Sequence, residues 1–480
     1  MTVPAQARGT GTTYIHTEGL PVSDKRQQEK LALEGGLKAV TSIEGKGQPK
    51  IGVDEFMAVA ERFGFSESVL GKIRKAVESG DVGEGAYLAN YYAGLKQTKN
   101  EEYAALARKL FGVGYAIPMS SGTGALHSAF VAAGVGPGTE VICPAVGFFA
   151  TAAAVVSSKG IPVFCDVNES MQIDPTKIEA LITDRTVAIA PTHYQGGVCD
   201  MKSVMKVARK HKIKVIEDCA QSCGASYAGK LVGTYGDIGC FSISAYKIVG
   251  GGEGGLLITD KLRLYERANQ LAECGGLWRP IRFDPPRYKG ELYCGTNYRL
   301  SELEAAIDVV QMKKMPATVK RFRAAYTRVL KGLKTFKGIT PGLVNDIEGE
   351  VGYTLRFFPE SPRLAAKIAE ALRAENIPAG TRGPSGRDDW HIYHYMYPVT
   401  LKQGPTPDNC PFECPLYLQA GGDVNYAKGQ CPVADDLFDR AVSIRISQWY
   451  NAADCKHIAN GINKVLAAYC EPDPDGKPWM

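Results

Sequence analysis

The stretch that decides the fold is Phe241-Ser-Ile-Ser-Ala-Tyr-Lys-Ile-Val-Gly-Gly-Gly-Glu-Gly-Gly255. It opens with a short run of strand-forming residues and continues through Lys247 into a loop made almost entirely of glycine. Upstream, the apolar run Ile213-Lys-Val-Ile-Glu-Asp218 reads as a buried strand that ends in a carboxylate. The two stretches therefore predict a strand ending in Asp218 and a lysine beside a glycine-rich loop.

This pairing of a lysine with an aspartate is what the chemistry of pyridoxal 5′-phosphate requires. The lysine amine forms a Schiff base with the aldehyde of that cofactor, and the carboxylate keeps the pyridine nitrogen protonated, so that the ring can draw in electrons. Taken alone, Lys247 would be read as a surface lysine and Asp218 as a helix cap. Together they are the catalytic candidates.

Short β-branched runs alternate with helical stretches in the sequence around these residues. Helices are expected at residues 54–78, with a break near Gly64, and at residues 99–111, where Gly112 ends the helical pattern. Strands are expected at residues 115–119, 140–143, 161–165, 187–191, 213–218, 240–243 and 255–259. This alternation predicts an α/β fold with a mostly parallel seven-stranded sheet between layers of helices.

The pattern changes after the last of these strands. A long charged helix is expected at residues 302–333, and a smaller α/β segment from about residue 338 ends in a helix at residues 452–469. Residues 383–431 are rich in Gly, Pro and aromatic residues, a structureless stretch of the kind that is usually functional or disordered. We therefore expect three parts: an N-terminal arm (1–50) that is flexible over its first thirty residues, a large cofactor-binding domain (51–330) and a small C-terminal domain (331–480).

The composition, with 45% hydrophobic and 22% charged residues, is that of an ordinary soluble globular protein. The net charge of +5 is spread without a basic tail, so no nucleic-acid partner is expected. No signal peptide and no membrane-spanning run is recognised. The thirteen cysteines are an odd number, which favours reduced thiols in the cytoplasm over a disulfide framework. Three of them, Cys410, Cys414 and Cys431, lack the regular spacing of a zinc site, so no metal is expected.

A second motif, Met119-Ser-Ser-Gly-Thr-Gly-Ala-Leu126, follows an expected strand and opens a helix. Its small residues let the backbone approach an anion, its free N–H groups point at the anion, and Thr123 adds a hydroxyl. Ser242, five residues before Lys247, offers a second hydroxyl at a strand end. These residues predict a phosphate site, although a turn of this composition also occurs without an anion and Ser242 alone would be an ordinary strand serine.

The order of these elements resembles that of the DegT/StrS-type sugar aminotransferases, which are pyridoxal phosphate enzymes of fold type I. The resemblance covers about residues 51–470. Its motifs are Ser121-Gly-Thr-Gly-Ala-Leu126, Glu140-Val-Ile-Cys-Pro144, Pro191-Thr-His193, Ile216-Glu-Asp-Cys-Ala-Gln221, the stretch from Phe241 to Gly255, and Asn297-Tyr-Arg-Leu-Ser-Glu-Leu303. Leu31-Ala-Leu-Glu-Gly-Gly36 resembles the opening of the subgroup that acts on keto-cyclitols and related sugars.

The resemblance implies a role for each matching residue. Lys247 holds the internal aldimine, Asp218 pairs with the pyridinium nitrogen, and Gln221 hydrogen-bonds the ring hydroxyl. The other implied contacts are those of Ala220 and Phe148 with the two ring faces, of Gly122, Thr123, Gly124 and Ser242 with the phosphate, and of Asn297 with the phosphate of a neighbouring subunit. The last contact implies a homodimer with shared active sites, or a higher oligomer built from it.

Several residues also have structural interpretations. Phe148 fits plain core, and Asn297 fits a turn or the cap of the following helix. His193 is either a buried hydrogen-bonded histidine or a residue that lines the site. Cys223 stands where many relatives carry histidine, and Ser244-Ala-Tyr246 departs from the commoner His-Pro pattern before the lysine. Because Cys223 replaces histidine, the contact that this histidine makes around the cofactor is not expected here. The change at Ser244-Ala-Tyr246 alters the wall of the site that faces the substrate.

The expected reaction moves an amino group from an amino acid, glutamate or glutamine, to a ketone on a sugar or cyclitol. Lys247 carries the proton in both halves of this ping-pong reaction. An alternative on the same fold is a pyridoxal phosphate sugar dehydratase, a subgroup with histidine in place of the lysine. Another is a non-catalytic relative, which should lack Lys247 or Asp218. The acceptor stays open, because the run Asp389-Trp-His-Ile-Tyr-His-Tyr-Met-Tyr397 either overhangs the pocket or packs the two domains together.

Overall fold

The computed structural model describes residues 30–42, 51–80, 88, 98–276, 278–384 and 386–480. The flexible stretch expected over the first thirty residues thus falls almost wholly outside the described residues. The chain divides into two units, residues 1–87 and 88–480. The boundaries expected near residues 50 and 330 stay predictions. Among the described residues, no helix is both long and apolar enough to cross a membrane.

The first unit contains a helical hairpin. Its elements are η1 (Ala32–Glu34), α2 (Val53–Glu61) and α3 (Glu67–Glu78). The expected break between the two longer helices is present at Gly64, whose φ of +72° lies in the left-handed region that favours glycine. Arg74 donates to Asp54 over 2.9 Å and so connects α3 to the start of α2.

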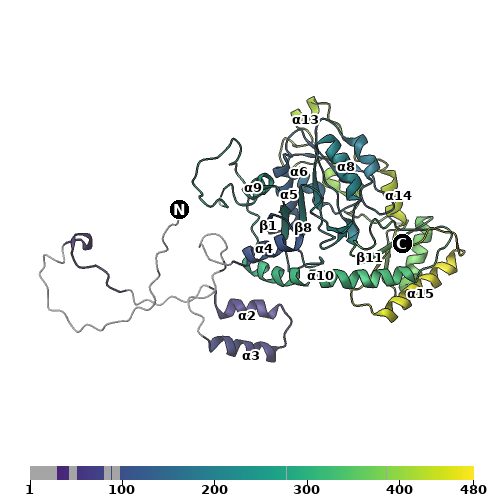
Figure 1. The fold of residues 1–480 in the computed structure, drawn as a ribbon, viewed down its shortest axis with the longest axis horizontal. Helices are drawn as coiled ribbons and strands as arrows, with labels where there is room; N and C mark the ends of the chain where they lie inside the picture. The colour runs from purple at the N-terminus through teal and green to yellow at the C-terminus, as the bar shows by residue number, and fades with distance from the viewer. Residues whose placement is uncertain (1–29, 43–50, 81–87, 89–97, 277, 385) are drawn as a thin grey trace. The chain divides into compact units, whose positions relative to one another are not determined.

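A seven-stranded sheet forms the centre of the second unit (Figure 1). Its strands are β1 (Tyr115–Met119), β2 (Glu140–Pro144), β3 (Ile161–Cys165), β4 (Thr186–Ile189), β5 (Lys214–Asp218), β8 (Ile238–Ser242) and β9 (Gly255–Thr259). Their order is β1-β9-β8-β5-β4-β2-β3, and β9 runs antiparallel to both of its neighbours while the other pairs are parallel. The expected α/β fold is therefore confirmed. A small hairpin of β6 (Ser226–Tyr227) and β7 (Lys230–Leu231) stands beside the sheet.

Helices cover both faces of this sheet because the strand side chains alternate between them. Along β9, Leu256 and Ile258 pack against α4 and α10, whereas Leu257 packs against α5 and α9. On β5, Val215 faces α8 and Ile216 faces the α5 side. The covering helices and short connecting turns are α4 (Lys99–Phe111), α5 (Gly122–Ala133), α6 (Ala150–Ser157), α7 (Pro175–Ile178), η2 (Glu179–Leu181), η3 (Tyr194–Gly196), α8 (Met201–His211), α9 (Leu262–Ala272) and α10 (Glu302–Lys331).

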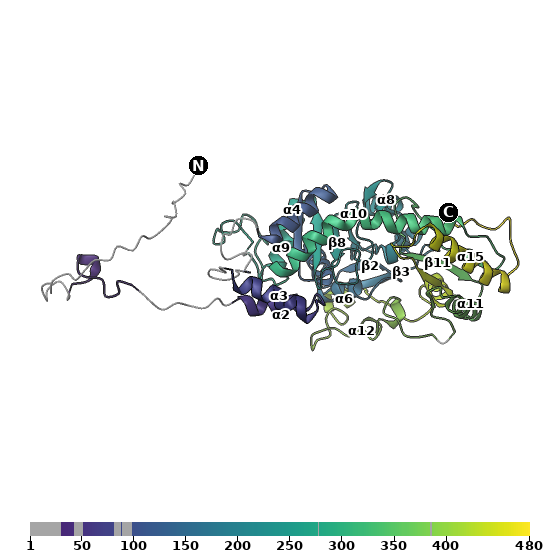
Figure 2. The same cartoon turned by 90° about the horizontal axis from the view of Figure 1, so that it is seen from below.

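The long helix α10 connects the large sheet to a second, four-stranded sheet (Figure 2). That sheet is antiparallel and has the order β10-β11-β13-β12. Its strands and covering helices are β10 (Ile339–Pro341), β11 (Thr354–Pro359), β12 (Ala379–Thr381), β13 (Val442–Arg445), α11 (Pro362–Ala374), α14 (Pro432–Arg440) and α15 (Ala452–Tyr469). This is the smaller C-terminal α/β segment that the sequence predicted.

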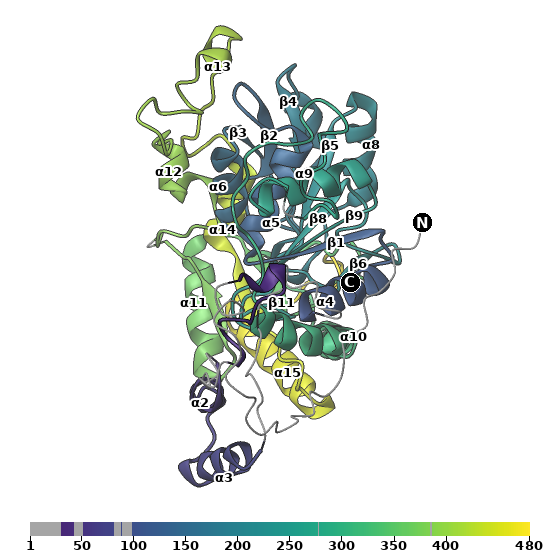
Figure 3. The ribbon, with the colours of Figure 1, turned by 90° about the vertical axis from the view of Figure 1, so that its left-hand side faces the viewer.

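The stretch at residues 383–431, expected to be structureless, contains short helices, so that expectation is wrong. These helices are η4 (Tyr393–Tyr395), α12 (Tyr397–Thr400) and α13 (Pro415–Gln419), and they lie on the side of the large sheet where β2 and β3 run (Figure 3). Side chains hold them there: Tyr417 donates to Glu140 of β2, and Tyr426 donates to the carbonyl of Pro162 in β3. Long-range contacts of this kind fix a segment that has no periodicity of its own.

Candidate active site

Lys247 lies in the loop that follows β8, as predicted. The loop folds back on itself, because Ala245 donates to the carbonyl of Gly252 and Ser244 forms a β-bridge with Gly252. The lysine side chain is half-buried, and its burial lowers the pKa of the amine below the ordinary value. The nearby carboxylates of Asp218 and Glu253 raise this pKa, but they only partly offset the effect of burial. A larger fraction of the amine is therefore unprotonated and nucleophilic near neutral pH.

Asp218 ends β5, and its carboxylate is buried and held by two donors. Oδ2 accepts a 2.6 Å hydrogen bond from the hydroxyl of Thr151 in α6, and Oδ1 accepts one from the backbone N–H of Ala220 over 3.0 Å. Each carboxylate oxygen has a further lone pair. Asp218 is thus fixed in orientation yet can still bind a positively charged N–H group. Thr151 carries no sign of a site in the sequence, because it lies in an apolar run that reads as core.

The candidate phosphate residues come together at the start of α5. Ser121 caps this helix by accepting from Gly124, which leaves the N–H groups of Gly122 and Thr123 pointing out of the helix end. Gly122 touches Ser242, since a Cβ at Gly122 would lie 2.7 Å from the Cβ of that serine. Only glycine allows this approach of the helix to the end of β8. The structure therefore joins the two motifs that the sequence offered separately.

Gln221 is oriented by the turn η3. Its side-chain oxygen accepts from the backbone N–H of Gln195 over 3.0 Å, so the amide nitrogen faces away from that bond and can donate elsewhere. Gln195 has a φ of +47°, an uncommon conformation for a residue with a side chain. Such strained residues cluster beside functional sites. The hydroxyl of Tyr353 also donates to the carbonyl of Gln221, which fixes the backbone.

Phe148 does not belong to the core, because 45% of its surface is exposed. Its ring lies 5.3 Å from the ring of His391, which also contacts Tyr194 at 5.9 Å. The backbone of Gly147 donates to the carbonyl of His391, so the aromatic run is attached directly beside Phe148. Further along the same run, Tyr393 packs with core residues of both sheets. The position of the aromatic run is therefore compatible with both interpretations, an overhang above the pocket and packing between the two domains.

Asn297 is exposed and lies just before α10. Its side-chain oxygen accepts from the backbone N–H of Arg299, and its amide nitrogen has no partner among the described residues. The cap of α10 is Ser301, whose hydroxyl accepts from Glu304. The alternative that Asn297 caps this helix is therefore wrong.

His193 and Cys223 are structural residues. The Nδ1 atom of His193 accepts from the backbone N–H of Cys199, and Nε2 lies 3.2 Å from Glu217, so the proton is assigned to Nε2. Glu217 points away from Asp218 because successive strand residues alternate. His193 therefore does not contact the Asp218 carboxylate. Cys223 is buried, with its sulfur 3.6 Å from that of Met315 in α10.

A pair of carboxyl groups that was not expected from the sequence lies against the glycine loop. Asp308 is fully buried in α10, and neither of its oxygens has a partner among the described residues. Glu304, one turn earlier, also has a buried oxygen that no described residue contacts through a hydrogen bond. A Cβ at Gly251 would lie 2.5 Å from Asp308 and 2.6 Å from Glu304, so both acids press against the same loop residue. The buried hydroxyl of Tyr103 in α4 likewise has no hydrogen-bond partner within the described ranges.

These groups fit pyridoxal phosphate. Lys247 offers an amine with a lowered pKa, and Asp218 offers a buried carboxylate with lone pairs to spare. At the phosphate end, Gly122 lies next to Ser242, and a Cβ atom on residue 122 would fill the space between them. Thr192 forms a β-bridge with Asp218, and its buried hydroxyl has no hydrogen-bond partner in the described part of the chain. An orphaned hydroxyl beside an oriented carboxylate is expected where a ligand completes the site.

Comparison with known proteins agrees with this geometry. Residues 91–383 match the sequence model of the DegT/DnrJ/EryC1/StrS aminotransferase family. L-glutamine:2-deoxy-scyllo-inosose aminotransferase from Micromonospora echinospora is 33% identical over 78% of this chain and 88% of its own length. GDP-perosamine synthase from Caulobacter vibrioides is 41% identical, but the match spans 42% of this chain and about half (53%) of that relative. The crystal structure of NtdA from Bacillus subtilis with bound cofactor PMP shares the fold, with a TM-score of 0.61 and 23% identity over 89% of this chain and 87% of that one.

Proposed function

Since the chain belongs to the DegT/DnrJ/EryC1/StrS aminotransferase family, we propose that it transfers an amino group from glutamine or glutamate to a ketone on a sugar or cyclitol. Family membership makes the protein a pyridoxal phosphate-dependent aminotransferase, as expected from Lys247 and Asp218. The observation that carries the proposal is the pair of Asp218, at the end of β5, and Lys247, in the loop that follows the neighbouring strand β8. The chain that holds this pair aligns with 88% of a glutamine-dependent cyclitol aminotransferase.

Pyridoxal phosphate, when bound, supplies an electron sink that stabilises negative charge on the carbon bearing the amino group. Lys247 holds this cofactor through its amine in our proposal, and the same amine moves the proton once the amino donor has displaced it. Burial lowers the pKa of Lys247, which suits a group that must first accept and then release a proton near neutral pH. One lysine thus acts as both nucleophile and proton carrier.

Asp218 holds a proton on the pyridine nitrogen in this proposal. The hydroxyl of Thr151 and the N–H of Ala220 keep its carboxylate in one orientation, so that little reorganisation is needed when charge develops. The amide nitrogen of Gln221 donates to the ring hydroxyl, and Ala220 and Phe148 contact the ring faces. The phosphate is bound by the N–H groups at the start of α5 with the hydroxyls of Thr123 and Ser242.

We further propose that the active sites are shared across a homodimer. Asn297 supports this, because its amide nitrogen is exposed and has no partner within its own subunit among the described residues. A two-fold axis would make the contact reciprocal, so each subunit would supply one Asn297 to the phosphate of the other.

A substrate panel tests the reaction. The purified protein is incubated with glutamine, glutamate or alanine and with a keto-cyclitol, a keto-hexose or a nucleotide-linked keto-sugar, and products are identified by mass. We expect an aminated product with glutamine or glutamate, and none in a Lys247→Ala control. A product that has instead lost a hydroxyl would identify a dehydratase, and the absence of amination with every acceptor would overturn the proposal.

A further inference from the structure

The segment that carries Asn297 is attached to the phosphate-binding turn of its own chain. The backbone N–H of Ser120, just before α5, donates to the carbonyl of Tyr298 over 2.8 Å. The adjacent residues, Met119 and Arg299, form an antiparallel β-bridge. The backbone beside Asn297 and the backbone that leads to the candidate phosphate site therefore form one short ladder, so neither can move far without the other.

The side chain of Tyr298 makes a second connection to the same turn. A Cβ at Gly124 would lie 3.1 Å from Cγ of Tyr298, so the tyrosine ring packs directly on the backbone of the helix start. Its hydroxyl lies 2.8 Å from Nδ1 of His127, one turn further along α5, and the centres of the two rings are 5.8 Å apart. Tyr298 thus contacts the first two turns of α5, the helix whose free N–H groups are the candidate phosphate ligands.

The hydrogen bond between Tyr298 and His127 has a defined direction. Burial lowers the pKa of the His127 imidazole and raises the pKa of the Tyr298 phenol. At neutral pH the phenol therefore keeps its proton and the imidazole is neutral, so the hydroxyl donates to Nδ1 and the ring proton is assigned to Nε2. The bond needs no charge on either ring and does not depend on pH near neutrality.

We propose that Tyr298 is a positioning residue that couples the two phosphate sites of the dimer, because it holds Asn297 against the phosphate-binding turn of its own subunit. This coupling rests on the proposed function, in which Asn297 of one subunit binds the phosphate at the site of the other. Tyr298 acts through its neighbours, since its carbonyl and its ring hold the turn at Ser120 and Gly124 while its backbone carries Asn297. The segment therefore responds both to the turn of its own subunit and to the phosphate of the other.

The coupling favours the filling of both sites. When a phosphate accepts from the N–H groups of Gly122 and Thr123, the turn loses freedom of motion, and Tyr298 restrains Asn297 with it. A side chain that is already held in place loses less conformational entropy when it binds the phosphate of the other site. By reciprocity, an Asn297 bound at the other site steadies the turn of its own subunit by the same free energy. The second cofactor therefore binds more tightly than the first.

The test is a binding titration of the full-length, cofactor-free protein with pyridoxamine 5′-phosphate, followed by calorimetry. This compound has the phosphate and the ring of the cofactor but no aldehyde to react with Lys247, so the titration measures binding alone. We expect two intrinsic dissociation constants, the second lower than the first by about fivefold or more, which is the lower end of the usual coupling between sites. Equal constants in the wild type would overturn the proposal.

Three variants locate the coupling in the bond between Tyr298 and His127. Tyr298→Phe keeps the ring on Gly124 but loses the hydroxyl, and His127→Leu loses the acceptor, so both should bring the two constants toward equality. His127→Asn should keep the wild-type ratio, because the amide oxygen of asparagine stands near the position of Nδ1 and can accept the same bond. Wild-type coupling in Tyr298→Phe, or equal behaviour of the two His127 variants, would overturn the proposal.

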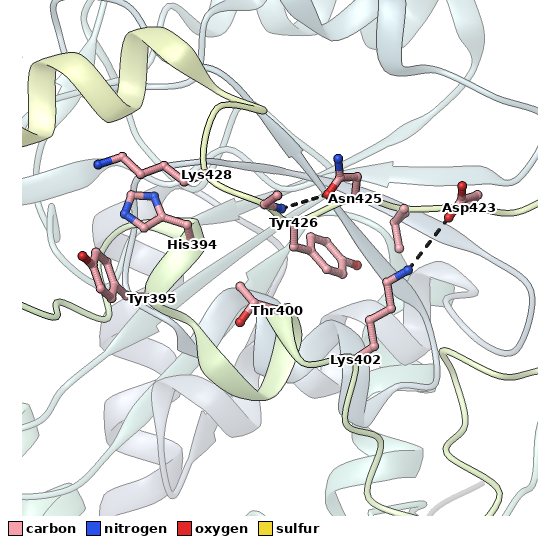
Figure 4. Close-up of a pocket in the computed structure, with 10 residues that line it drawn as sticks. His394, Tyr395, Thr400, Lys402, Asp423, Asn425, Tyr426 and Lys428 are labelled. Atoms are coloured by element: carbon pink, nitrogen blue, oxygen red, sulfur yellow. Dashed lines mark hydrogen bonds and ion pairs between the residues drawn. The ribbon is translucent and has the colours of Figure 1, made fainter.

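Tyr426→Phe is the matched control for Tyr298→Phe. Tyr426 also donates its hydroxyl over 2.8 Å, to the carbonyl of Pro162, and it lines the pocket between η4 and the segment at residues 423–428 (Figure 4). None of the residues that line this pocket belongs to the phosphate-binding turn or to residues 297–299, so this variant should keep the wild-type ratio. A loss of coupling in the control as large as that in Tyr298→Phe would count against a specific role of Tyr298 and overturn the proposal.

Asn297→Ala separates the coupling from the proposed function. This variant should weaken binding at both sites and abolish the coupling, since it removes the side chain that each subunit gives to the other. Binding as tight as that of the wild type would refute the shared site itself, and the coupling with it. Weakened binding in Asn297→Ala together with unchanged coupling in Tyr298→Phe would leave the shared site in place and overturn the role of Tyr298 alone.

Discussion

Asp308→Asn should change how the stability of the protein depends on pH. The wild-type carboxyl is fully buried and has no hydrogen-bond partner among the residues that the structure describes, and burial together with the nearby Glu304 raises its pKa from the ordinary value to about 8. Glu253 in the glycine loop and Tyr103 in α4 are the other titratable groups that interact with this pair. Asparagine has the same shape but no proton to lose, so it resembles the protonated acid at every pH.

Whether the protein gains or loses stability as the pH rises depends on whether the folded or the unfolded chain holds the proton of Asp308. Between about pH 4 and pH 8 the unfolded chain has lost the proton of Asp308 while the folded chain still holds it. Stability therefore falls as pH rises, by at most about 1.4 kcal/mol per pH unit, and the contribution present below pH 4 is gone above pH 8. Between pH 5 and pH 7 the ideal loss is about 2.7 kcal/mol. Solvent screening near the half-exposed Glu304 reduces the expected loss to about 1–2 kcal/mol.

The assay is urea unfolding of the cofactor-free protein at pH 5, 6 and 7, followed by circular dichroism. The free energy of unfolding of Asp308→Asn minus that of the wild type should grow by about 1–2 kcal/mol over this range. Asp184→Asn, which alters an exposed carboxyl, is the control and should stay parallel to the wild type. A difference that is constant with pH would refute the reasoning, since it would mean that Asp308 is already ionised or bears a counter-ion at pH 5.

The remaining predictions concern the proposed catalytic residues. Lys247→Ala should abolish turnover, and peptide mapping of borohydride-reduced wild type should find the cofactor label on Lys247; a label on another lysine would sink the assignment. Asp218→Asn should keep the cofactor but lose most of its kcat, because an amide cannot hold a proton on the pyridine nitrogen; a near-normal kcat would mean that Asp218 does not face it. Thr151→Val should lower kcat about tenfold, the loss of one hydrogen bond to a charged group, and an unchanged kcat would contradict its orienting role. Lys247→Ala and Asn297→Ala proteins, mixed under conditions that exchange subunits, should regain activity because one site of each heterodimer carries neither change; no recovery despite proven exchange would count against the shared site.

The seven strands could be predicted because each is a short apolar run between turn residues. Strands buried on both faces are nearly continuous apolar segments, and this pattern is local. The direction of β9 could not be predicted, since Leu256-Leu-Ile258 reads the same in either orientation. The helices of residues 383–431 escaped prediction for another reason. Their positions depend on contacts such as that of Tyr417 with Glu140, between residues far apart in the chain.

Within the site, the sequence could name residues but not their partners. Lys247, Asp218 and the glycine-rich turns stand out because their chemistry and spacing are distinctive. Thr151 carries no such mark, and only the fold shows that its hydroxyl meets Asp218. For His193 the sequence left two interpretations open, and the structure favours the buried hydrogen-bonded one, because its ring belongs to a buried network with Glu217. Residue type thus predicts which chemistry a side chain can perform. The face of the strand from which the side chain projects decides whether it reaches the site.

Asp308 is the residue that the sequence could have revealed. Ala305, Val309 and Met312 form a buried stripe at helical spacing along α10, and Asp308 falls inside that stripe. An acid on the apolar face of a helix must lose its charge, find a cation or bind a hydrogen-bond donor, because an isolated buried carboxylate is too costly. The many charged residues of α10 hide this signal, because a helix taken as charged throughout has every acid in solvent. Taken position by position, the same pattern predicts a protonated acid on the buried face of α10, and only the fold shows that this acid lies against Gly251 in the loop that carries Lys247.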